Sequence, residues 1–329
     1  MNYIVMDLEW NQADGKLISE GGLPFEIVEI GAVRLNRFMW MTGEFEELVK
    51  PKIYPHIHYM TSQIVHLDAE DFKKGRPFVD VMSDFLSWCK DSYIFCIWGT
   101  LDLTELQRNM CFYGMEELTD RPLAFLDVQK LYSIAYEDGK VRRALEYAVN
   151  ELNIPKDKPF HRAKNDAYYT AKVLQMIHKK HRDVESFLSY DLFMVPQNKE
   201  TEIRVNFKNY YKYISREFPD KTEAMKDNEV SSTSCYLCGS PTKKIVKWFS
   251  VNGRHYYYVG HCEKHGYMKC KVRMKKADDG NVFVVKTQKI VNEDVVSDIK
   301  EKQEKLRLQR AERRHKDTEN TENEKTDQS

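Results

Sequence analysis

Four acidic residues and one histidine fall at the ends of predicted strands and helices: Asp7, Glu9, Asp102, His161 and Asp166. Asp7 and Glu9 follow the apolar run Tyr3–Met6, and residues two apart on a strand face the same side. Like charges held together at a buried strand end repel each other unless a cation lies between them. Carboxylate oxygens on a rigid support suit Mg²⁺ or Mn²⁺. The spacing therefore predicts a divalent-cation site.

The same carboxylates predict a particular kind of reaction. Four carboxylates suffice for two cations about 3.5–4 Å apart, the arrangement used for in-line displacement at phosphorus. Such a reaction needs a base for the attacking water, and histidine titrates near neutral pH. His161 lies five residues before Asp166, so a loop and a first helical turn can place both beside one cation. Taken alone, Asp102 and Asp166 are ordinary first-turn acids that a helix dipole stabilises.

A second group of potential metal ligands lies late in the chain and consists of Cys235, Cys238, Cys262 and His265. They form two short turns, each followed by glycine, on either side of a strand-rich stretch. Four nitrogen and sulfur ligands at this spacing are typical of the closed, structural zinc site of a zinc ribbon, so we expect a zinc-ribbon-like module. The fourth ligand stays open, because His261 and Cys270 lie close to His265 in the sequence.

The length of the chain predicts two or three domains, and its charged residues balance to a net charge of zero. The chain has 329 residues, with 51 Lys and Arg against 51 Asp and Glu. No run is long and apolar enough to span a bilayer, and the N-terminus lacks the features of a signal peptide. Cys89, Cys96 and Cys111 lie in apolar surroundings, as buried reduced cysteines do. These features predict a cytoplasmic protein without disulfides.

The charges are divided unevenly along the chain. Residues 1–182 contain 23 Lys and Arg against 27 Asp and Glu, a net charge of −4, whereas residues 235–290 contain 12 against 3, or +9. We expect residues 183–234 to be a packing arm and linker. Residues 235–291 would form the basic module, and 292–329 a charged helix with a disordered tail. A basic module beside an acidic one suits a polyanion that is held in one place and cut in another.

Apolar runs and helical periodicity predict an α/β domain with a mixed sheet flanked by helices over residues 1–182. The predicted strands are Tyr3–Met6, Phe25–Leu35, Phe45–Val49, Tyr93–Trp98 and Leu123–Val128. The predicted helices are Phe78–Cys89, Leu103–Met110, Gln129–Tyr136, Arg142–Leu152 and Lys164–His181. The small C-terminal module is predicted to be β-rich, with its clearest strands at Tyr256–Val259 and Val282–Val285. In such a domain the three acidic segments can meet at one edge of the sheet.

The order Asp7-x-Glu9, Asp102 and His161-x4-Asp166 resembles the three motifs of the DEDDh 3′→5′ exonucleases, the superfamily of proofreading subunits and ribonuclease T. The resemblance covers residues 1 to about 182. Within the superfamily, the chain is most similar to the branch of histone-mRNA exonucleases and sporulation-inhibitor-type bacterial proteins. The segments that carry this similarity are Tyr3–Trp10, Glu26–Val33, Val49–Pro51, Gly75–Phe78, Trp98–Asp102 and Phe160–Ala163.

The resemblance implies a ribonuclease H-like fold and a metal-dependent exonuclease that cuts single-stranded nucleic acid, RNA rather than DNA, into nucleoside monophosphates. It makes His161 the general base, and it assigns two Mg²⁺ or Mn²⁺ ions to Asp7, Glu9, Asp102 and Asp166. Proofreading members often have Thr-Thr-Gly after the first motif, where this chain has Trp10-Asn11-Gln12. Trp10 and Trp98 are the candidate substrate-binding residues. The ring of Trp10 either stacks on the terminal base or is a core aromatic that closes the sheet.

Two alternative functions remain open at this stage. The first is a DNA-trimming or proofreading-type exonuclease, because metal-bound phosphoryl transfer does not need the 2′-hydroxyl group. The second is an inactive nuclease fold that only binds nucleic acid, against which stands the presence of all five predicted catalytic residues. The C-terminal module interleaves lysines with aromatic residues, a pattern that suits single strands, although some of these aromatics must form its core.

Overall fold

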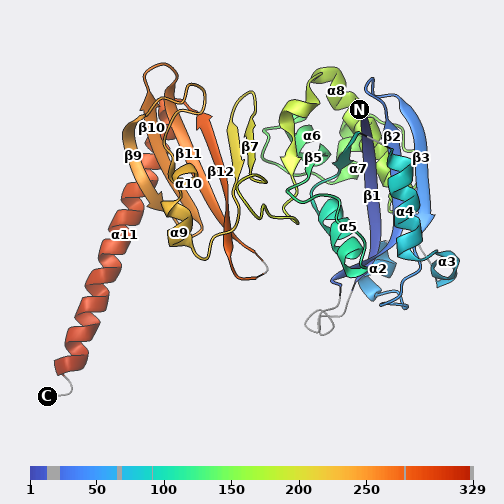
Figure 1. The fold of residues 1–329 in the computed structure, drawn as a ribbon, viewed down its shortest axis with the longest axis horizontal. Coiled ribbons are helices and arrows are strands. Elements are labelled where there is room, and N and C mark those ends of the chain that lie inside the picture. Colours follow the sequence, from blue (N-terminus) through green and yellow to red (C-terminus); the bar gives the residue numbers. More distant parts are fainter. Residues whose placement is uncertain (13–22, 65–68, 91, 278, 327–329) are drawn as a thin grey trace. The chain divides into compact units, whose positions relative to one another are not determined.

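The structure is a computed structural model that describes residues 1–12, 23–64, 69–90, 92–277 and 279–326 (Figure 1). The chain divides into two compact units, Met1–Met194 and Val195–Ser329. Each unit contains one six-stranded sheet. Among the described residues, no helix combines the length and the apolar character needed to cross a membrane.

The sheet of the first unit consists of β1 (Asn2–Gln12), β2 (Phe25–Leu35), β3 (Met41–Leu48), β4 (Tyr93–Ile97), β5 (Ala124–Asp127) and β6 (Ser189–Tyr190). These strands lie in the order β3-β2-β1-β4-β5-β6. β1 pairs antiparallel with β2 and parallel with β4, which in turn pairs parallel with β5. The predicted mixed α/β fold is therefore confirmed.

Helices cover both faces of this sheet, and they are α2 (Tyr59–Ile64), α3 (Ala69–Lys74), α4 (Phe78–Cys89), α5 (Leu101–Phe112), α6 (Val128–Tyr136), α7 (Leu145–Glu151) and α8 (Ala163–Lys180). Along β1, the even-numbered Ile4 and Met6 pack with α4 and α5. The odd-numbered Tyr3 and Val5 pack with α6, α7 and α8. Because side chains alternate along a strand, Asp7 and Glu9 share the face that α8 covers.

The sheet of the second unit consists of β7 (Ile203–Asn206), β8 (Tyr211–Ile214), β9 (Lys243–Ser250), β10 (His255–Cys262), β11 (Gly266–Lys276) and β12 (Val282–Ile290). The strands lie in the order β7-β8-β12-β11-β10-β9, and all pairs are antiparallel. On one face, Ala224 of α9 (Lys221–Lys226) and Val230 of α10 (Asn228–Ser231) pack against Val272 and Val284. On the other face, α11 (Glu293–Thr326) packs its first turns against β9 and β10 (Figure 1).

The unit boundary differs from the one expected at residue 182. Residues 183–194 contain a 3-10 helix, η1 (Val184–Phe187), and β6, which pairs with β5, so they belong to the first unit. Residues 195–234, expected as arm and linker, supply β7, β8, α9 and α10 to the second unit. β8 pairs with β12, which is distant along the chain. A short strand that depends on a distant partner is hard to predict from its own residues.

The C-terminal tail differs from its expectation as well. α11 is one helix over Glu293–Thr326, where we expected a shorter helix and a disordered end. This range contains no glycine or proline and is rich in Glu, Lys, Arg and Gln, which favour helix. Residues 327–329 lie outside the described part of the chain.

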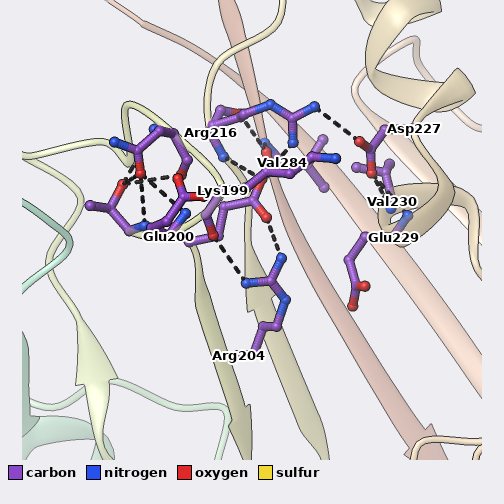
Figure 2. A network of polar contacts seen from close by, with 12 residues as sticks. Lys199, Glu200, Arg204, Arg216, Asp227, Glu229, Val230 and Val284 are labelled. Carbon is purple, nitrogen blue, oxygen red and sulfur yellow. Dashed lines mark hydrogen bonds and ion pairs between the residues drawn. The ribbon is translucent and has the colours of Figure 1, made fainter.

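A network of ion pairs holds the first elements of the second unit together. Glu202 is buried and accepts hydrogen bonds from the side chains of Arg204 and Arg216. Arg216 also donates to Asp227, with Nη2 and Oδ2 3.1 Å apart (Figure 2). Asp227 in turn accepts from the backbone N–H of Glu229 and so caps α10. Removing both arginines would leave the buried charge of Glu202 unpaired, which would destabilise this unit.

Candidate active site and metal centre

Asp7 and Glu9 lie inside β1 rather than after its last residue, which corrects the sequence expectation. The strand continues to Gln12 because β2 pairs with it that far, whereas its pairing with β4 ends at Val5. Beyond Val5, β4 no longer pairs with β1. The two carboxylates therefore lie on a part of β1 that β2 still holds but that no longer pairs with β4.

Asp102 lies beside the part of β1 after Val5, where β1 no longer pairs with β4. It belongs to the first turn of α5, which starts four residues after β4 ends, and its side chain is buried. Burial raises the pKa of its carboxyl group, and the nearby backbone N–H of Leu8 in β1 partly offsets that rise by favouring the charged form. The start of α5 therefore lies beside the strand that carries Asp7 and Glu9.

Asp166 approaches from the first turn of α8. Its Oδ2 accepts a hydrogen bond of 3.2 Å from the backbone N–H of His161, while its Oδ1 is buried without a hydrogen-bond partner. His161 precedes the helix with a φ of 63°, an unusual backbone conformation for a residue with a side chain. Its side chain is exposed. The loop conformation and the carboxylate orientation are therefore coupled.

Gly31 of β2 allows α8 to start this close to the sheet. A Cβ atom at Gly31 would lie 2.0 Å from the backbone N of Lys164 and 2.1 Å from the carbonyl carbon of Ala163. Both contacts are with backbone, which cannot move aside as a side chain can. Since Gly31 pairs with Asp7 across the sheet, the close approach occurs directly beside the acidic residues.

The geometry brings three of the four predicted acids to one point. Carboxylate oxygens of Asp7, Glu9 and Asp166 all lie within 4.8 Å of one another, the spacing of ligands around one cation. Asp102 lies outside that group, but its charge acts on Asp7. Burial raises the pKa of Asp7 well above its usual range, and the charges of Asp102 and Glu9 raise it further.

The other acids respond in the same direction. Burial raises the pKa of Glu9 to about 8, and the charge of Asp166 adds to this effect. Burial also raises the pKa of Asp102 to about 7 and that of Asp166 to about 6. Acids crowded in this way are stable as anions only beside positive charge, so the residues present fit divalent cations.

One ion pair at this site was not predicted from the sequence. Glu29 of β2 is fully buried opposite Glu9, and its carboxylate accepts from Nε and Nη2 of Arg162 at 3.1 and 2.9 Å. It also accepts from the backbone N–H of Ala163 at 3.3 Å. Arg162 is the residue after His161, so this pair holds the loop that presents His161 and Asp166. The signal was a charged residue in the middle of a mostly apolar strand, two positions before Gly31.

Residues 4–174 match the family described as RNase_T, Exonuclease. The chain belongs to this family. All five predicted catalytic residues lie inside the matched range, and the family falls within the DEDDh superfamily whose motifs the sequence resembles. A search of curated proteins found no match to the sequence.

Several solved structures are similar to this RNase_T exonuclease. The nuclease domain of 3′hExo bound to rAMP is 17% identical, with a TM-score of 0.48, 58% of this chain and 96% of that chain covered. A 3′-exonuclease solved for its recognition of the histone mRNA stem-loop is 16% identical, with a TM-score of 0.46 and coverage of 55% and 82%. The S. pombe protein Pop2p in its Mg²⁺- and Mn²⁺-bound form is 13% identical, with a TM-score of 0.43 and coverage of 60% and 89%.

The two tryptophans expected to bind substrate also pack within the RNase_T domain. The ring of Trp10 lies 5.3 Å from that of Phe25. The indole N–H of Trp98 donates to the carbonyl of Arg143 at 3.1 Å, and its ring lies 6.1 Å from Tyr132. Both are half-buried, so part of each ring remains accessible. Packing and substrate contact are compatible at both positions.

The second unit, beyond the matched range, contains a cluster of cysteines and a histidine: Cys235, Cys238, Cys262 and His265. One ligand atom of each lies within 4.8 Å of all the others. The Sγ atoms of Cys238 and Cys262 are 3.7 Å apart, and Nδ1 of His265 lies 3.5 Å from Sγ of Cys235 and 3.6 Å from Sγ of Cys262. A tetrahedral zinc site with bonds of about 2.3 Å to sulfur and 2.0 Å to nitrogen has edges of about 3.5–3.8 Å. The distances therefore fit zinc.

The fold of the cluster also separates His265 from the other candidate ligands. Cys262 ends β10, and the turn to β11 carries His265, so the hairpin presents both. His261 and Cys270 lie outside the cluster, and the Sγ of Cys270 accepts from the side chain of Gln288 instead. Gly239 and Gly266 follow the second ligand of each turn with φ of 72° and 81°, which glycine adopts readily.

Proposed function

We propose that this protein is a metal-dependent 3′→5′ exonuclease that releases nucleoside monophosphates from single strands, with RNA preferred to DNA. The observation that supports this most strongly is that carboxylate oxygens of Asp7, Glu9 and Asp166 lie within 4.8 Å of one another, while the buried Oδ1 of Asp166 has no hydrogen-bond partner. A buried carboxylate oxygen without a hydrogen-bond partner requires an explanation, and a role as a cation ligand is a direct one. The preference for RNA rests on the resemblance of the sequence to the histone-mRNA branch.

The chain's own residues then have distinct roles. Asp7, Glu9, Asp102 and Asp166 would hold two Mg²⁺ or Mn²⁺ ions. Bound there, these ions lower the pKa of a water molecule and neutralise charge on the leaving oxygen. His161 accepts the proton of the attacking water, and because its side chain is exposed it can pass that proton to solvent. Trp10 and Trp98 would contact the end of the strand.

Direction and substrate can be tested on one set of oligonucleotides. A strand labelled at its 3′ end should release a labelled mononucleotide at once, whereas the same strand labelled at its 5′ end should shorten stepwise. RNA and DNA of equal sequence are compared with Mg²⁺ present and absent. Release of the 5′ label before shortening, or equal activity without a divalent cation, would contradict the proposal.

We further propose that the cysteine and histidine cluster of the second unit binds one structural Zn²⁺. The four ligands leave no open position for substrate, so the ion would serve folding rather than hydrolysis. Thiolate ligands need a reducing compartment, which supports a cytoplasmic location. Elemental analysis of protein purified without chelator should find one zinc per chain, and protein free of zinc would refute the site.

A further inference from the structure

The second unit carries lysines on one face of its sheet. Directly paired residues of neighbouring strands share a face, and the register pairs Lys271 with Tyr257 and Lys269 with Lys289. Lys302 of α11 lies over the ring of Tyr257, so it belongs to the same surface. We call Lys269, Lys271, Lys289 and Lys302 the lysine face.

The positive charges of the lysine face are crowded. Three Nζ atoms, those of Lys269, Lys271 and Lys302, lie 5.8, 5.9 and 5.0 Å from the centre of the Tyr257 ring. Lys269 and Lys289 are direct cross-strand neighbours, a position at which like charges repel. Burial lowers the pKa of Lys269 and of Lys271, and neighbouring cations lower both further.

Ion pairing does not neutralise this charge, although Asp298 of α11 attracts Lys269 electrostatically. Across the described part of the chain, no acidic side chain forms an ion pair with Lys269, Lys271 or Lys289. Elsewhere in the same unit, Arg216 has two acidic partners, Glu202 and Asp227. Arg216 is thus neutralised inside the unit, whereas Lys269, Lys271 and Lys289 form no ion pair within the described residues and can pair with an external anion.

The lysine face is also accessible. The opposite face of the sheet is covered by α9 and α10. On the lysine side, the buried Val296 and Ile299 of α11 pack with Val246 of β9 and Val259 of β10. Lys289, on β12, and Lys302, on α11, are exposed, whereas Lys269 and Lys271 are half-buried. A linear ligand can therefore contact several lysines across β11 and β12 beside α11.

We propose that the lysine face binds the sugar-phosphate backbone of the single strand that the first unit hydrolyses, an inference that rests on the proposed function. A row of lysines makes ionic contacts with successive phosphates without reading the bases. A nucleic acid is favoured over other polyanions because the same chain contains an exonuclease domain. Residues 1–182 carry a net charge of −4, so long-range attraction for a polyanion must come from elsewhere in the chain.

The test changes Lys271 and Lys289 to glutamine in the full chain, with Asp7→Asn added to all variants to prevent cleavage. Fluorescence anisotropy with a long labelled single strand gives Kd as a function of salt. Losing two phosphate contacts should raise Kd roughly fiftyfold at about 50 mM salt and reduce the slope of log Kd against log salt by about 1.4. The matched control is Lys221→Gln with Lys226→Gln on α9, which removes the same charge from the opposite side of the sheet.

The expected result is a loss of affinity in the lysine-face variant, parental affinity in the control, and recovery with Lys271→Arg and Lys289→Arg. Equal Kd values in the lysine-face and control variants would overturn the inference. It would also be overturned if binding to phosphatidylserine vesicles were lost while strand binding persisted, because the face would then be a membrane site.

A dinucleotide separates this inference from the proposed function. With Asp7 intact, the Lys271→Gln and Lys289→Gln chain should hydrolyse it at the parental rate, because so short a substrate needs only the first unit. A parental chain without dinucleotide hydrolysis would refute the exonuclease assignment. The anisotropy result would still decide whether the lysine face binds strands.

Discussion

At the scale of single residues, the acids of the first unit form a site that is under strain without cations. Asp7, Glu9 and Asp166 meet within 4.8 Å, and Asp102 lies close enough for its charge to act on Asp7. Crowded, desolvated carboxylates destabilise a fold unless they are protonated or paired with positive charge. Stability and metal binding are consequently linked at these residues.

The first prediction is a dependence of stability on pH. The pKa values of Glu9, Asp102 and Asp166 are raised to about 8, 7 and 6, so the folded, magnesium-free protein holds protons that the unfolded chain has lost. Stability should therefore fall as the pH rises from roughly 4 to 8. Thermal unfolding in magnesium-free buffer measures this. Saturating Mg²⁺ or Asp7→Asn should reduce the fall, and a Tm that increases over this range without metal would contradict it.

The second prediction concerns the base. His161→Ala should lower kcat by roughly two to four orders of magnitude, because a positioned acid–base group contributes that much. Affinity for Mg²⁺ should change little, since His161 bonds to Asp166 through its backbone N–H. His178→Ala, in the last turn of α8, serves as the control. An active His161→Ala enzyme with an unaltered pH profile would exclude His161 as the base.

The third prediction tests the buried ion pair as a positioning device. Glu29→Gln should lower kcat and weaken Mg²⁺ binding, because Arg162 loses its carboxylate partner and the loop before α8 is no longer held. If the pair acts as a unit, Arg162→Gln should have a similar effect, and the double variant should be little worse than either. Glu202→Gln removes an equally buried, arginine-paired acid from the second unit and should leave dinucleotide hydrolysis unchanged. Fully additive losses would argue against a joint role.

At the scale of elements, the site depends on how closely α8 starts over β2. Gly31 has no side chain where the backbone of Lys164 and Ala163 passes, and Glu29 bonds that same segment from two positions away. β1 is held by β2 beyond the point where β4 ends, which keeps Glu9 on rigid backbone. The geometry of the acids is therefore a property of β1, β2, α5 and α8 together.

The fourth prediction follows from that packing. Gly31→Ala should displace the first turn of α8, since the new methyl group would lie about 2 Å from backbone atoms. Overpacking of this kind costs about 1–3 kcal/mol and should lower kcat by moving Asp166. The control is Gly43→Ala, whose nearest neighbour is the end of the flexible Arg34 side chain at 3.0 Å. Parental kcat and Tm in Gly31→Ala would show that the contact is not critical.

At the scale of the whole molecule, hydrolysis and a large share of strand binding fall to different units. The first unit contains the acids and matches the exonuclease family, whereas the second carries the lysine face and the cysteine and histidine cluster. Zinc at this cluster would join the turn before β9 to the hairpin of β10 and β11. Loss of zinc should then disturb binding before it disturbs chemistry.

The fifth prediction is that Cys262→Ser unfolds the second unit and leaves the first unit active. Structural zinc contributes directly to folding, so the variant should show an additional low-temperature unfolding transition and weaker binding of long strands. Hydrolysis of a dinucleotide should remain near the parental rate. Cys111→Ser, at an exposed cysteine of the first unit, controls for the substitution itself. Unchanged zinc content in Cys262→Ser would refute this ligand assignment.

The sequence by itself determined the α/β class and the positions of the acids along the chain. Asp7, Glu9, Asp102 and Asp166 could be found because each lies within or next to a segment with a strong local hydrophobic pattern. The two metal-ligand turns were equally local, since each pair of ligands is separated by two residues. Short-range spacing of this kind can be recognised from the amino-acid sequence alone.

Only the tertiary structure decided which of these residues meet. The Glu29–Arg162 pair and the contact of Gly31 with α8 join positions more than a hundred residues apart, and no local pattern marks such partners. Likewise, β8 joined the second sheet by pairing with β12, and the lysine face arose from the register of β10, β11 and β12. Register and long-range packing depend on the whole folded chain, because each contact is stable only when its neighbours have also formed.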